Sequence, residues 1–255
     1  VVAVVALAKE AAVKVTKTIM KNFSEEIHKL NDLGAIYLLL GAACNMSCRH
    51  CVQTPIKSCF NLSPQGENLS QEVKDFIVAW SNLPWKYAEN NPRRLYFWGG
   101  EPLLYWETIK KLVLEFKQSG VKNVSYRIFS NGLLLNDEIV DFCNENDIWF
   151  IMSYDAPNAR AARNAVPSKE ACKKFLRIRK RTVNTVFNAI NDNMAEAFDW
   201  LHYTFPETEI TCGFINVLSE HTPLDLYQFK PNVVKKSVKN LWLIAKSDSK
   251  IAPYI

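Results

Sequence analysis

Short apolar runs alternate with helical patterns along most of this chain. Six runs are rich in β-branched and aromatic residues, and most are apolar enough to be strands buried on both faces; they lie at 35–40, 94–98, 124–129, 149–153, 182–190 and 209–217. Apolar residues recur at helical spacing between and after them, over 71–80, 106–119, 137–146, 168–179, 193–202 and 232–245. Strands that alternate with helices predict an α/β fold with a parallel sheet.

Polar and glycine residues at the ends of these elements sharpen the prediction. Ser70 and Asn136 are typical caps before helices, and Gly120 ends a third helix. Six strand–helix units fall short of the eight that close a barrel, so we expect a partial (β/α)6 TIM-like barrel.

The first residues do not fit the strand–helix alternation. The opening VVAVVALA is far shorter than a membrane span, and lysines follow it. We therefore expect an amphipathic helix from residue 1 to about residue 30, and neither a signal peptide nor a membrane anchor. This divides the chain into an N-terminal helical segment at 1–33 and a barrel domain at 34–255.

Unusual polar and glycine-containing groups follow directly after the predicted strands. They are GAACNMSCRHC at 41–51, GGEP at 99–102, SNG at 130–132, SYDAP at 153–157 and NAIND at 188–192. The carboxyl ends of parallel strands form one edge of the sheet, which is where α/β enzymes bind their ligands. We expect the functional site at this edge.

Three cysteines, Cys44, Cys48 and Cys51, lie within one short loop. Thiolates are ligands for iron–sulfur clusters, zinc or copper(I). A structural zinc site needs four ligands, and Cys59 is the near candidate for a fourth; Cys59 could also complete an electron-transfer cluster. A c-type haem is excluded because Val52, not His, follows Cys51. Three ligands on a four-iron cluster would leave one iron open to a substrate.

This C-x3-C-x2-C loop after the first strand resembles the defining loop of the radical S-adenosylmethionine (radical SAM) superfamily. The resemblance implies a [4Fe–4S] cluster on Cys44, Cys48 and Cys51, whose open iron binds the amino and carboxylate groups of S-adenosylmethionine. Electron transfer then breaks the sulfonium bond and gives a 5′-deoxyadenosyl radical. The residue before the last cysteine, here His50, is expected near the adenine.

Further segments resemble the motifs by which this superfamily binds S-adenosylmethionine. Gly99, Gly100, Glu101 and Pro102 match the GGEP motif, which holds the methionine amino group. The SNG and S-x-D segments supply groups suited to a ribose and a carboxylate, and Asn188 could also reach the cofactor; the residues are Ser130, Asn131, Ser153 and Asp155. The alternative for each short motif is a turn that caps the next helix.

Charge and cysteine content narrow the class of protein. The chain has 31 basic and 26 acidic residues and a net charge of +5, which is not the uniformly basic surface of a nucleic-acid coat. The basic run at 173–181 is typical of a solvated helix face. Seven cysteines, an odd number with three in one loop, favour a metal site in a reducing compartment over disulfides. We expect a cytoplasmic protein that binds neither membrane nor nucleic acid.

The combined motifs resemble the branch that includes anaerobic sulfatase-maturating enzymes and peptide maturases with SPASM or twitch domains. That resemblance implies hydrogen abstraction from a peptide or protein substrate, with electrons from a flavodoxin- or ferredoxin-type donor. No cysteine follows Val217 to serve a second cluster, so a radical SAM enzyme for a small molecule or nucleoside is the alternative. An iron–sulfur redox protein or zinc-stabilised binding protein is the non-enzyme alternative.

Overall fold

The computed structural model describes residues 31–51, 53, 69–85, 91–155, 157–214 and 224–247, together with the backbone of 2–6. The described residues form two compact units. Every strand pairing recorded within either unit is parallel. Helix α6 (Asp137–Glu145) connects the last strand of the first unit to the first strand of the second along the chain.

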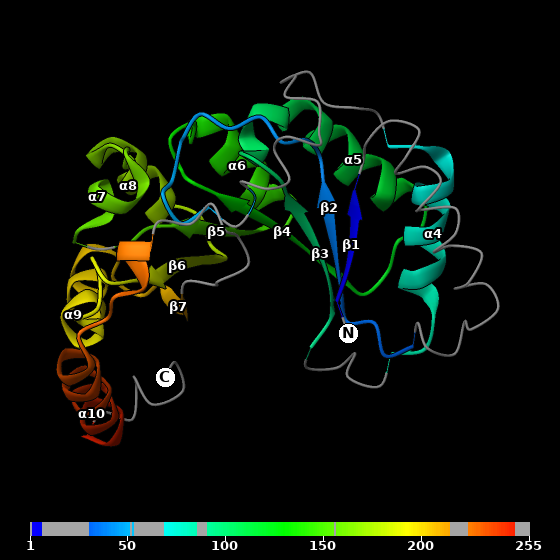
Figure 1. Cartoon of the computed structure of the whole chain (residues 1–255). Coiled ribbons are helices and arrows are strands. Elements are labelled where there is room, and N and C mark those ends of the chain that lie inside the picture. The colour runs from blue at the N-terminus through cyan, green and yellow to red at the C-terminus, as the bar shows by residue number, and fades with distance from the viewer. Residues whose placement is uncertain are drawn as a thin grey trace. The chain divides into compact units, whose positions relative to one another are not determined.

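The first unit is a parallel sheet with helices on one side (Figure 1). Its order follows the chain, because the second strand pairs with the first and third, and the third pairs with the fourth. The strands are β1 (Val2–Ala6), β2 (Ala35–Leu39), β3 (Arg93–Trp98) and β4 (Val124–Ser130). The helices are α4 (Gln71–Asn82), the 3-10 helix η1 (Pro102–Tyr105) and α5 (Trp106–Gln118).

Strand alternation gives this sheet two apolar faces. Leu38 pairs with Phe97, and both are fully buried on one face. The other face carries aromatic side chains, with the Tyr37 and Tyr96 rings stacked at 4.3 Å between centroids. Tyr37, Trp98 and Phe129 on this face are only partly buried, so the burial on both faces that the apolar runs predicted is incomplete.

The second unit repeats this arrangement with three strands. Phe150 of its first strand contacts Phe175, and Phe187 of its second contacts Phe198, so helices cover one face. The strands are β5 (Trp149–Ser153), β6 (Arg181–Phe187) and β7 (Glu209–Phe214). The helices are α7 (Ala159–Arg163), α8 (Lys169–Leu176), α9 (Met194–Thr204), the 3-10 helix η2 (Leu224–Tyr227) and α10 (Pro231–Ser247).

All six predicted strands and all six predicted helices are confirmed within a few residues. Asn136 caps its helix, since its Oδ1 accepts a hydrogen bond from Ile139 N at 2.9 Å. Ser70 stands at the N-cap of α4, but its side chain makes no cap hydrogen bond.

The predicted N-terminal helix is wrong where the chain is described. Val2–Ala6 is strand β1, and it pairs in parallel with β2. The sequence VAVVA is rich in β-branched valine, whose stiff side chains favour strands, and an open sheet edge beside β2 outweighs any helical preference. Residues 7–30 lie outside the described part, and the boundary between 33 and 34 stays a prediction.

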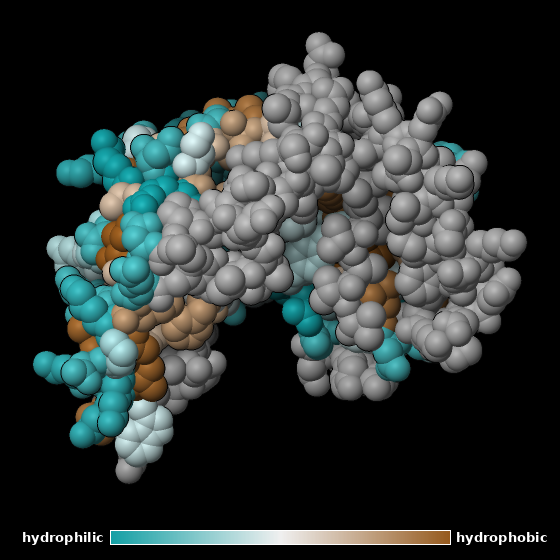
Figure 2. All heavy atoms as spheres, in the orientation of Figure 1, coloured by the Kyte–Doolittle hydropathy of each residue, from teal (hydrophilic) through white to brown (hydrophobic). Residues whose placement is uncertain are grey.

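Helices α9 and α10 leave apolar side chains at the surface. Val238, Trp242 and Leu243 of α10 are about half exposed, and Tyr203 of α9 is largely exposed. Figure 2 shows hydrophobic atoms among hydrophilic ones in this region. Among the described helices, none has the length and apolarity that crossing a bilayer requires.

Candidate active site

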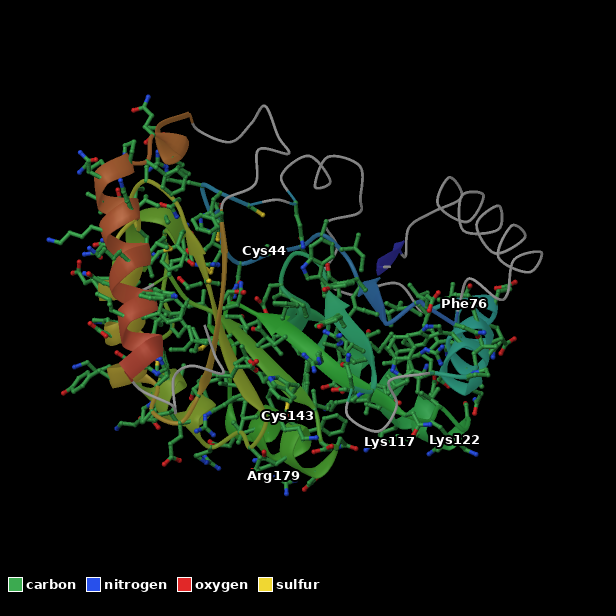
Figure 3. The ribbon with its side chains drawn as sticks, turned by 90° about the horizontal axis from the view of Figure 1, so that it is seen from below. Cys44, Phe76, Lys117, Lys122, Cys143 and Arg179 are labelled. Atoms are coloured by element: carbon green, nitrogen blue, oxygen red, sulfur yellow. The ribbon has the colours of Figure 1, made fainter. Side chains whose placement is uncertain are left out.

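The loops that follow β2 and β3 are joined by backbone hydrogen bonds in the first unit. Leu40 N donates to Trp98 O at 3.1 Å, Gly100 N to Gly41 O at 3.0 Å, and Glu101 N to Ala43 O at 2.8 Å. The parallel ladder thus continues past the ends of both strands. It fixes the chain up to the residue before Cys44, whose place in the loop after β2 is labelled in Figure 3.

Glycine is required at two positions of this join. A Cβ at Gly100 would lie 2.0 Å from Ala43 O and 2.5 Å from Ala42 O, far inside van der Waals contact. Gly99 has a φ of +150°, which side chains disfavour, and its Cβ would lie 2.5 Å from Gly41 O. The two glycines of GGEP therefore allow one loop to lie directly on the other.

Glu101 is buried at 1% exposure beside this join. Its Oε1 accepts hydrogen bonds from Leu103 N at 3.0 Å and from the Ser130 hydroxyl at 2.7 Å. The structure thus brings together two residues that the sequence placed on neighbouring strands. A carboxylate held by charge-assisted hydrogen bonds in a buried site is well suited to receive an ammonium group.

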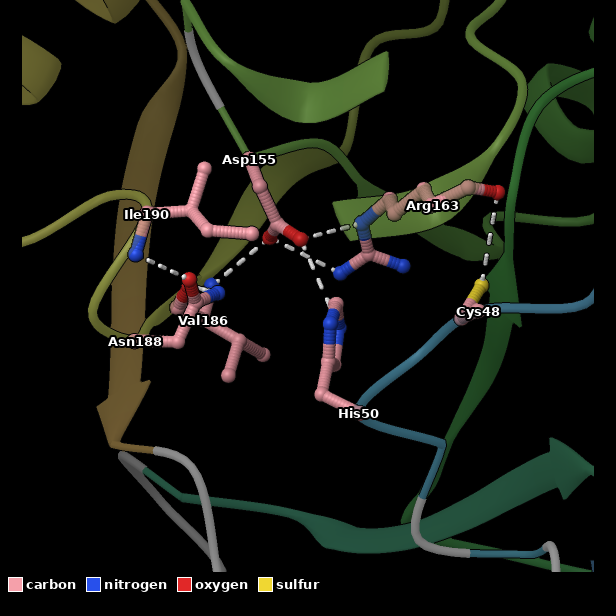
Figure 4. Close-up of polar contacts among 7 residues, drawn as sticks. All are labelled: Cys48, His50, Asp155, Arg163, Val186, Asn188 and Ile190. Carbon is pink, nitrogen blue, oxygen red and sulfur yellow. Dashed lines mark hydrogen bonds and ion pairs between the residues drawn. The ribbon is translucent and has the colours of Figure 1, made fainter. Parts of the chain in front are cut away.

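Asp155 is the centre of the polar network in the second unit (Figure 4). Arg163 donates two hydrogen bonds to the Asp155 carboxylate, from Nε at 2.6 Å and from Nη2 at 2.9 Å. Val186 N donates a third, to Oδ1, at 2.8 Å. The carboxylate is fully buried. Burial alone would lower the pKa of Arg163, but Asp155 outweighs it and raises that pKa, so the guanidinium stays charged. Asp155 therefore links α7 to β6.

His50 extends this network toward the cysteine loop. Its Nε2 lies 3.4 Å from Asp155 Oδ2. Burial lowers the pKa of His50 to about 4; the charge of Arg163 also lowers it, and Asp155 partly opposes both. The ring is therefore neutral at pH 7, and with its proton facing Asp155 its Nδ1 is an acceptor. Nδ1 is buried with no hydrogen-bond partner among the described residues.

The other predicted residues make local contacts. Asn131 Oδ1 accepts from Leu133 N at 2.9 Å, the turn geometry that was the alternative to ligand binding. Asn188 is fully buried, and its side chain bonds to Ile190 N and Val186 O. Ser153 ends β5 and is half-buried.

The candidate residues fall into both units. Cys44, Gly99, Gly100, Glu101, Pro102 and Ser130 belong to the first. Cys48, His50, Cys51, Asn131, Ser153, Asp155 and Asn188 belong to the second. Contacts within each set are those given above. In the described part of the chain, no three His, Cys, Asp or Glu side chains converge on a point that could hold a single metal ion.

The thiols nevertheless suit a soft metal cluster. Cys44, Cys48 and Cys51 are partly buried and outside any disulfide. Electrostatic and hydrogen-bond contact with the Cys48 sulfur contributes to the raised pKa of Arg163, so a fixed positive charge stands next to this thiol. A cation beside a cysteine stabilises the thiolate that ligates metals. Cys59, the fourth ligand of the zinc alternative, lies outside the described residues.

Two residues of these networks were missed at the level of sequence. Tyr105 of η1 accepts a hydrogen bond at its hydroxyl from Ala43 N, and its ring occupies the space that a Cβ on Gly41 would need. Arg163 lies eight positions after Asp155 in a five-residue helix. Neither residue belongs to a recurrent pattern, so the sequence carried no signal for either.

Comparison with known proteins gives one family. The model of the radical SAM superfamily matches residues 38–209, more than half of the chain. The radical SAM cyclopropyl synthase TigE of Paramaledivibacter caminithermalis is 28% identical over 185 residues, 67% of this chain and 38% of that protein. The serine-type anaerobic sulfatase-maturating enzyme of Bacteroides thetaiotaomicron is 28% identical over 124 residues, 46% of this chain and 28% of that enzyme. The chain thus spans about a third of the length of these curated relatives.

Solved structures share the fold. The enzyme anSMEcpe, solved with bound AdoMet (S-adenosylmethionine) and the Cp18Cys peptide, superposes with a TM-score of 0.65 at 17% identity, over 87% of this chain and 62% of that one. SuiB of Streptococcus suis, bound to S-adenosylmethionine, superposes with a TM-score of 0.56 at 13% identity, over 92% of this chain and 54% of that one. The predicted α/β partial barrel is confirmed. The chain belongs to the radical SAM superfamily, whose members use a [4Fe–4S] cluster and S-adenosylmethionine.

Proposed function

We propose that this chain cleaves S-adenosylmethionine reductively and uses the resulting radical to take a hydrogen atom from a peptide or protein substrate. The observation that carries the proposal is the loop of Cys44, Cys48 and Cys51, which begins directly after a backbone segment held by GGEP. The three thiols are the ligands of the cluster in this proposal, with one iron left for the cofactor. Once bound, the cluster supplies the electron that splits the sulfonium into methionine and a 5′-deoxyadenosyl radical.

In this proposal, the GGEP loop and Ser130 supply the groups for the methionine end of the cofactor. Glu101 accepts the amino group, because its buried carboxylate gains most from pairing with a cation where water is excluded. Ser130 holds that carboxylate in place. Gly99 and Gly100 let the backbone lie close to the start of the cysteine loop, and Pro102 begins the 3-10 helix whose Leu103 N donates to Glu101.

In this proposal, the polar residues around Asp155 supply the groups for the nucleoside end. His50 offers its neutral ring and the acceptor Nδ1 to the adenine, and Asp155 orients that ring through the contact at Nε2. Asn131 and Ser153 contribute polar groups for the ribose and, at the methionine end, for the carboxylate. Asn188 shapes the backbone where β6 ends, because both ends of its amide bond to neighbouring main chain.

A peptide or protein substrate is supported by the relatives. One is a sulfatase-maturating enzyme by name, and anSMEcpe was solved with a bound peptide. An electron donor of the flavodoxin or ferredoxin type and a cytoplasmic location complete the proposal, the latter from the thiol content of the chain. Mass spectrometry of peptides from cells that express the active chain, compared with a cluster-free variant, would identify the substrate.

The test of the chemistry is anaerobic reconstitution with iron and sulfide, reduction with dithionite, and detection of 5′-deoxyadenosine. Wild-type protein should form this product from S-adenosylmethionine, and Cys48→Ala should form none. Cys212→Ala is the matched control, because Cys212 is exposed on β7, and it should behave as wild type. Wild-type protein with an intact cluster and no product would contradict the proposal.

A further inference from the structure

The end of helix α7 lies against the cysteine loop, and both belong to the second unit. Arg49 N donates to Ala162 O at 2.9 Å, and Ser47 N donates to Asn164 Oδ1 at 3.1 Å. The Cys48 sulfur lies 3.9 Å from Arg163 O. Three consecutive residues of the loop, with Cys48 in the middle, thus contact three consecutive residues of the α7 end.

This contact uses a backbone conformation that few residues adopt. Asn164 has a φ of +58°, in the left-handed region that asparagine tolerates better than most side chains. The left-handed turn ends α7 after five residues, and Asn164 N closes it by donating to Arg160 O. Ending the helix here leaves the carbonyls of Ala162 and Arg163 available to the loop, because the last carbonyls of a helix have no partner within it.

The α7 end is itself held from within the fold. Arg163 is buried and paired with Asp155, which also accepts from Val186 N of β6. The loop has a second anchor, the ion pair of Arg49 with Asp225 of η2, but this pair is solvent-exposed and contributes little. Among the described residues, the buried support for the loop in this unit therefore consists of the α7 end and the contact of His50 with Asp155.

From this geometry we propose that Ala162–Asn164 is a clamp for the cluster loop, and that Asn164 is a positioning residue for the iron ligand Cys48. The clamp restricts Ser47 and Arg49, the neighbours of Cys48, and so slows the opening by which a cysteine ligand leaves its iron. The inference rests on the proposed ligation by Cys48. It assigns a role to residues outside the cofactor contacts proposed above.

The experiment compares Asn164→Gly with Asn164→Asp in the full chain. Glycine keeps the left-handed backbone and removes the acceptor for Ser47 N, whereas aspartate keeps an oxygen in its place. The matched control is Asn123→Gly, because Asn123 also has a positive φ, +54°, and lies in the first unit. Thermal unfolding confirms that each variant is folded.

Two readouts follow the loop directly. In Asn164→Gly, amide hydrogen exchange of Ser47 should be about fivefold faster, the factor expected for one lost hydrogen bond. The reconstituted cluster should lose its absorbance to a chelator faster by a similar factor. In Asn164→Asp and in Asn123→Gly, the rates of Ser47 amide exchange and of cluster loss should both match those of wild type.

The outcomes separate the clamp from the proposed function. Wild-type protein that assembles a cluster, with Asn164→Gly unchanged in exchange and chelation, overturns the clamp alone. Wild-type protein that assembles no cluster overturns the proposed function and the clamp with it. If Ser47 amide exchange and cluster loss to the chelator are accelerated equally in Asn164→Gly and Asn123→Gly, the clamp is also overturned, because the effect would then be general.

Discussion

The candidate residues form two sets, one in each unit, and the two sets are held in different ways. In the first unit, the backbone of one loop lies on the backbone of another, and glycines make the approach possible at Gly99 and Gly100. In the second unit, the loop that carries Cys48 and His50 is held by a buried ion pair and by the end of a short helix. The first set depends on the absence of side chains at the two glycines, and the second set depends on charged side chains.

This difference determines what each set tolerates. Backbone packing fails through steric overlap, which added volume causes and a change of charge does not. A buried ion pair fails when one partner is removed, because the remaining charge has lost both water and its counter-ion. Volume and charge substitutions therefore test the two sets separately.

The largest effect is expected from Arg163→Met, which removes the guanidinium from fully buried Asp155 while keeping most of the side-chain volume. Breaking a buried pair on one side costs about 3–5 kcal/mol of unfolding free energy. Urea unfolding measures the loss. Arg177→Met is the control, because Arg177 pairs with Asp137 at the surface and should cost less than about 1 kcal/mol. Equal losses in the two variants would contradict the importance of burial.

The next largest effect is expected from Gly100→Ala. Its methyl group would overlap the carbonyls of Ala42 and Ala43, so the joined loops must separate, at a cost of about 3 kcal/mol. Gly213→Ala is the matched change, since nothing lies within 4 Å of the Cβ position there. Thermal unfolding should show a clear loss for Gly100→Ala and almost none for Gly213→Ala. The reverse order would refute the close backbone approach.

A smaller loss is expected from Ser130→Ala, which removes one donor from buried Glu101. A hydrogen bond to a charged group contributes about 2 kcal/mol, roughly twice the value for a neutral acceptor. Ser130→Ala in a Glu101→Gln background provides the comparison, because the acceptor there is neutral and the loss should be about half as large. If Ser130→Ala loses the same unfolding free energy in both backgrounds, Glu101 is not held as a carboxylate.

The smallest effect is expected from Asp137→Asn. Hydrogen bonds from Lys174 and Arg177 lower the pKa of Asp137, but the carboxylate is exposed. Because the pKa of Asp137 is lower in the folded state, the ionised carboxylate stabilises the fold at pH values above the pKa that Asp137 has in the unfolded chain. This stabilisation is lost as the pH falls through the pKa of Asp137 in the folded state. In Asp137→Asn, the midpoint of thermal unfolding should fall barely at physiological salt and slightly more at low salt, where surface charges are screened less. A large, salt-independent loss would contradict the contrast with Arg163.

The candidate residues that the sequence predicts best are those of the first unit, which backbone contacts hold in place. GGEP and the cysteine loop are short, their spacing is fixed, and glycine is irreplaceable at Gly100, so the pattern carries the structure. Glu101 and Ser130 were also expected at one sheet edge, because both follow parallel strands, and the structure joins them.

The contacts of the second unit, which side chains make, were less predictable from the sequence. Asp155 was expected as a cofactor contact, but sequence gives no sign that Arg163 grips it from a five-residue helix too short to show a periodic pattern. Asn164 Oδ1 accepts from Ser47 N at the end of that helix, in a left-handed backbone conformation that composition does not reveal. Strand β1 was missed for a related reason, since five apolar residues fit a helix or a strand until the neighbouring β2 is known.

The most direct measurement is iron and sulfide content after anaerobic reconstitution, followed by the electron paramagnetic resonance spectrum of the reduced protein with and without S-adenosylmethionine. If Cys44, Cys48 and Cys51 hold a cluster with one open iron, the protein contains about four irons and four sulfides per chain. Its spectrum then changes when S-adenosylmethionine binds, and both properties are lost in Cys48→Ala. Bound zinc in place of iron, or a cluster whose spectrum ignores S-adenosylmethionine, would contradict this.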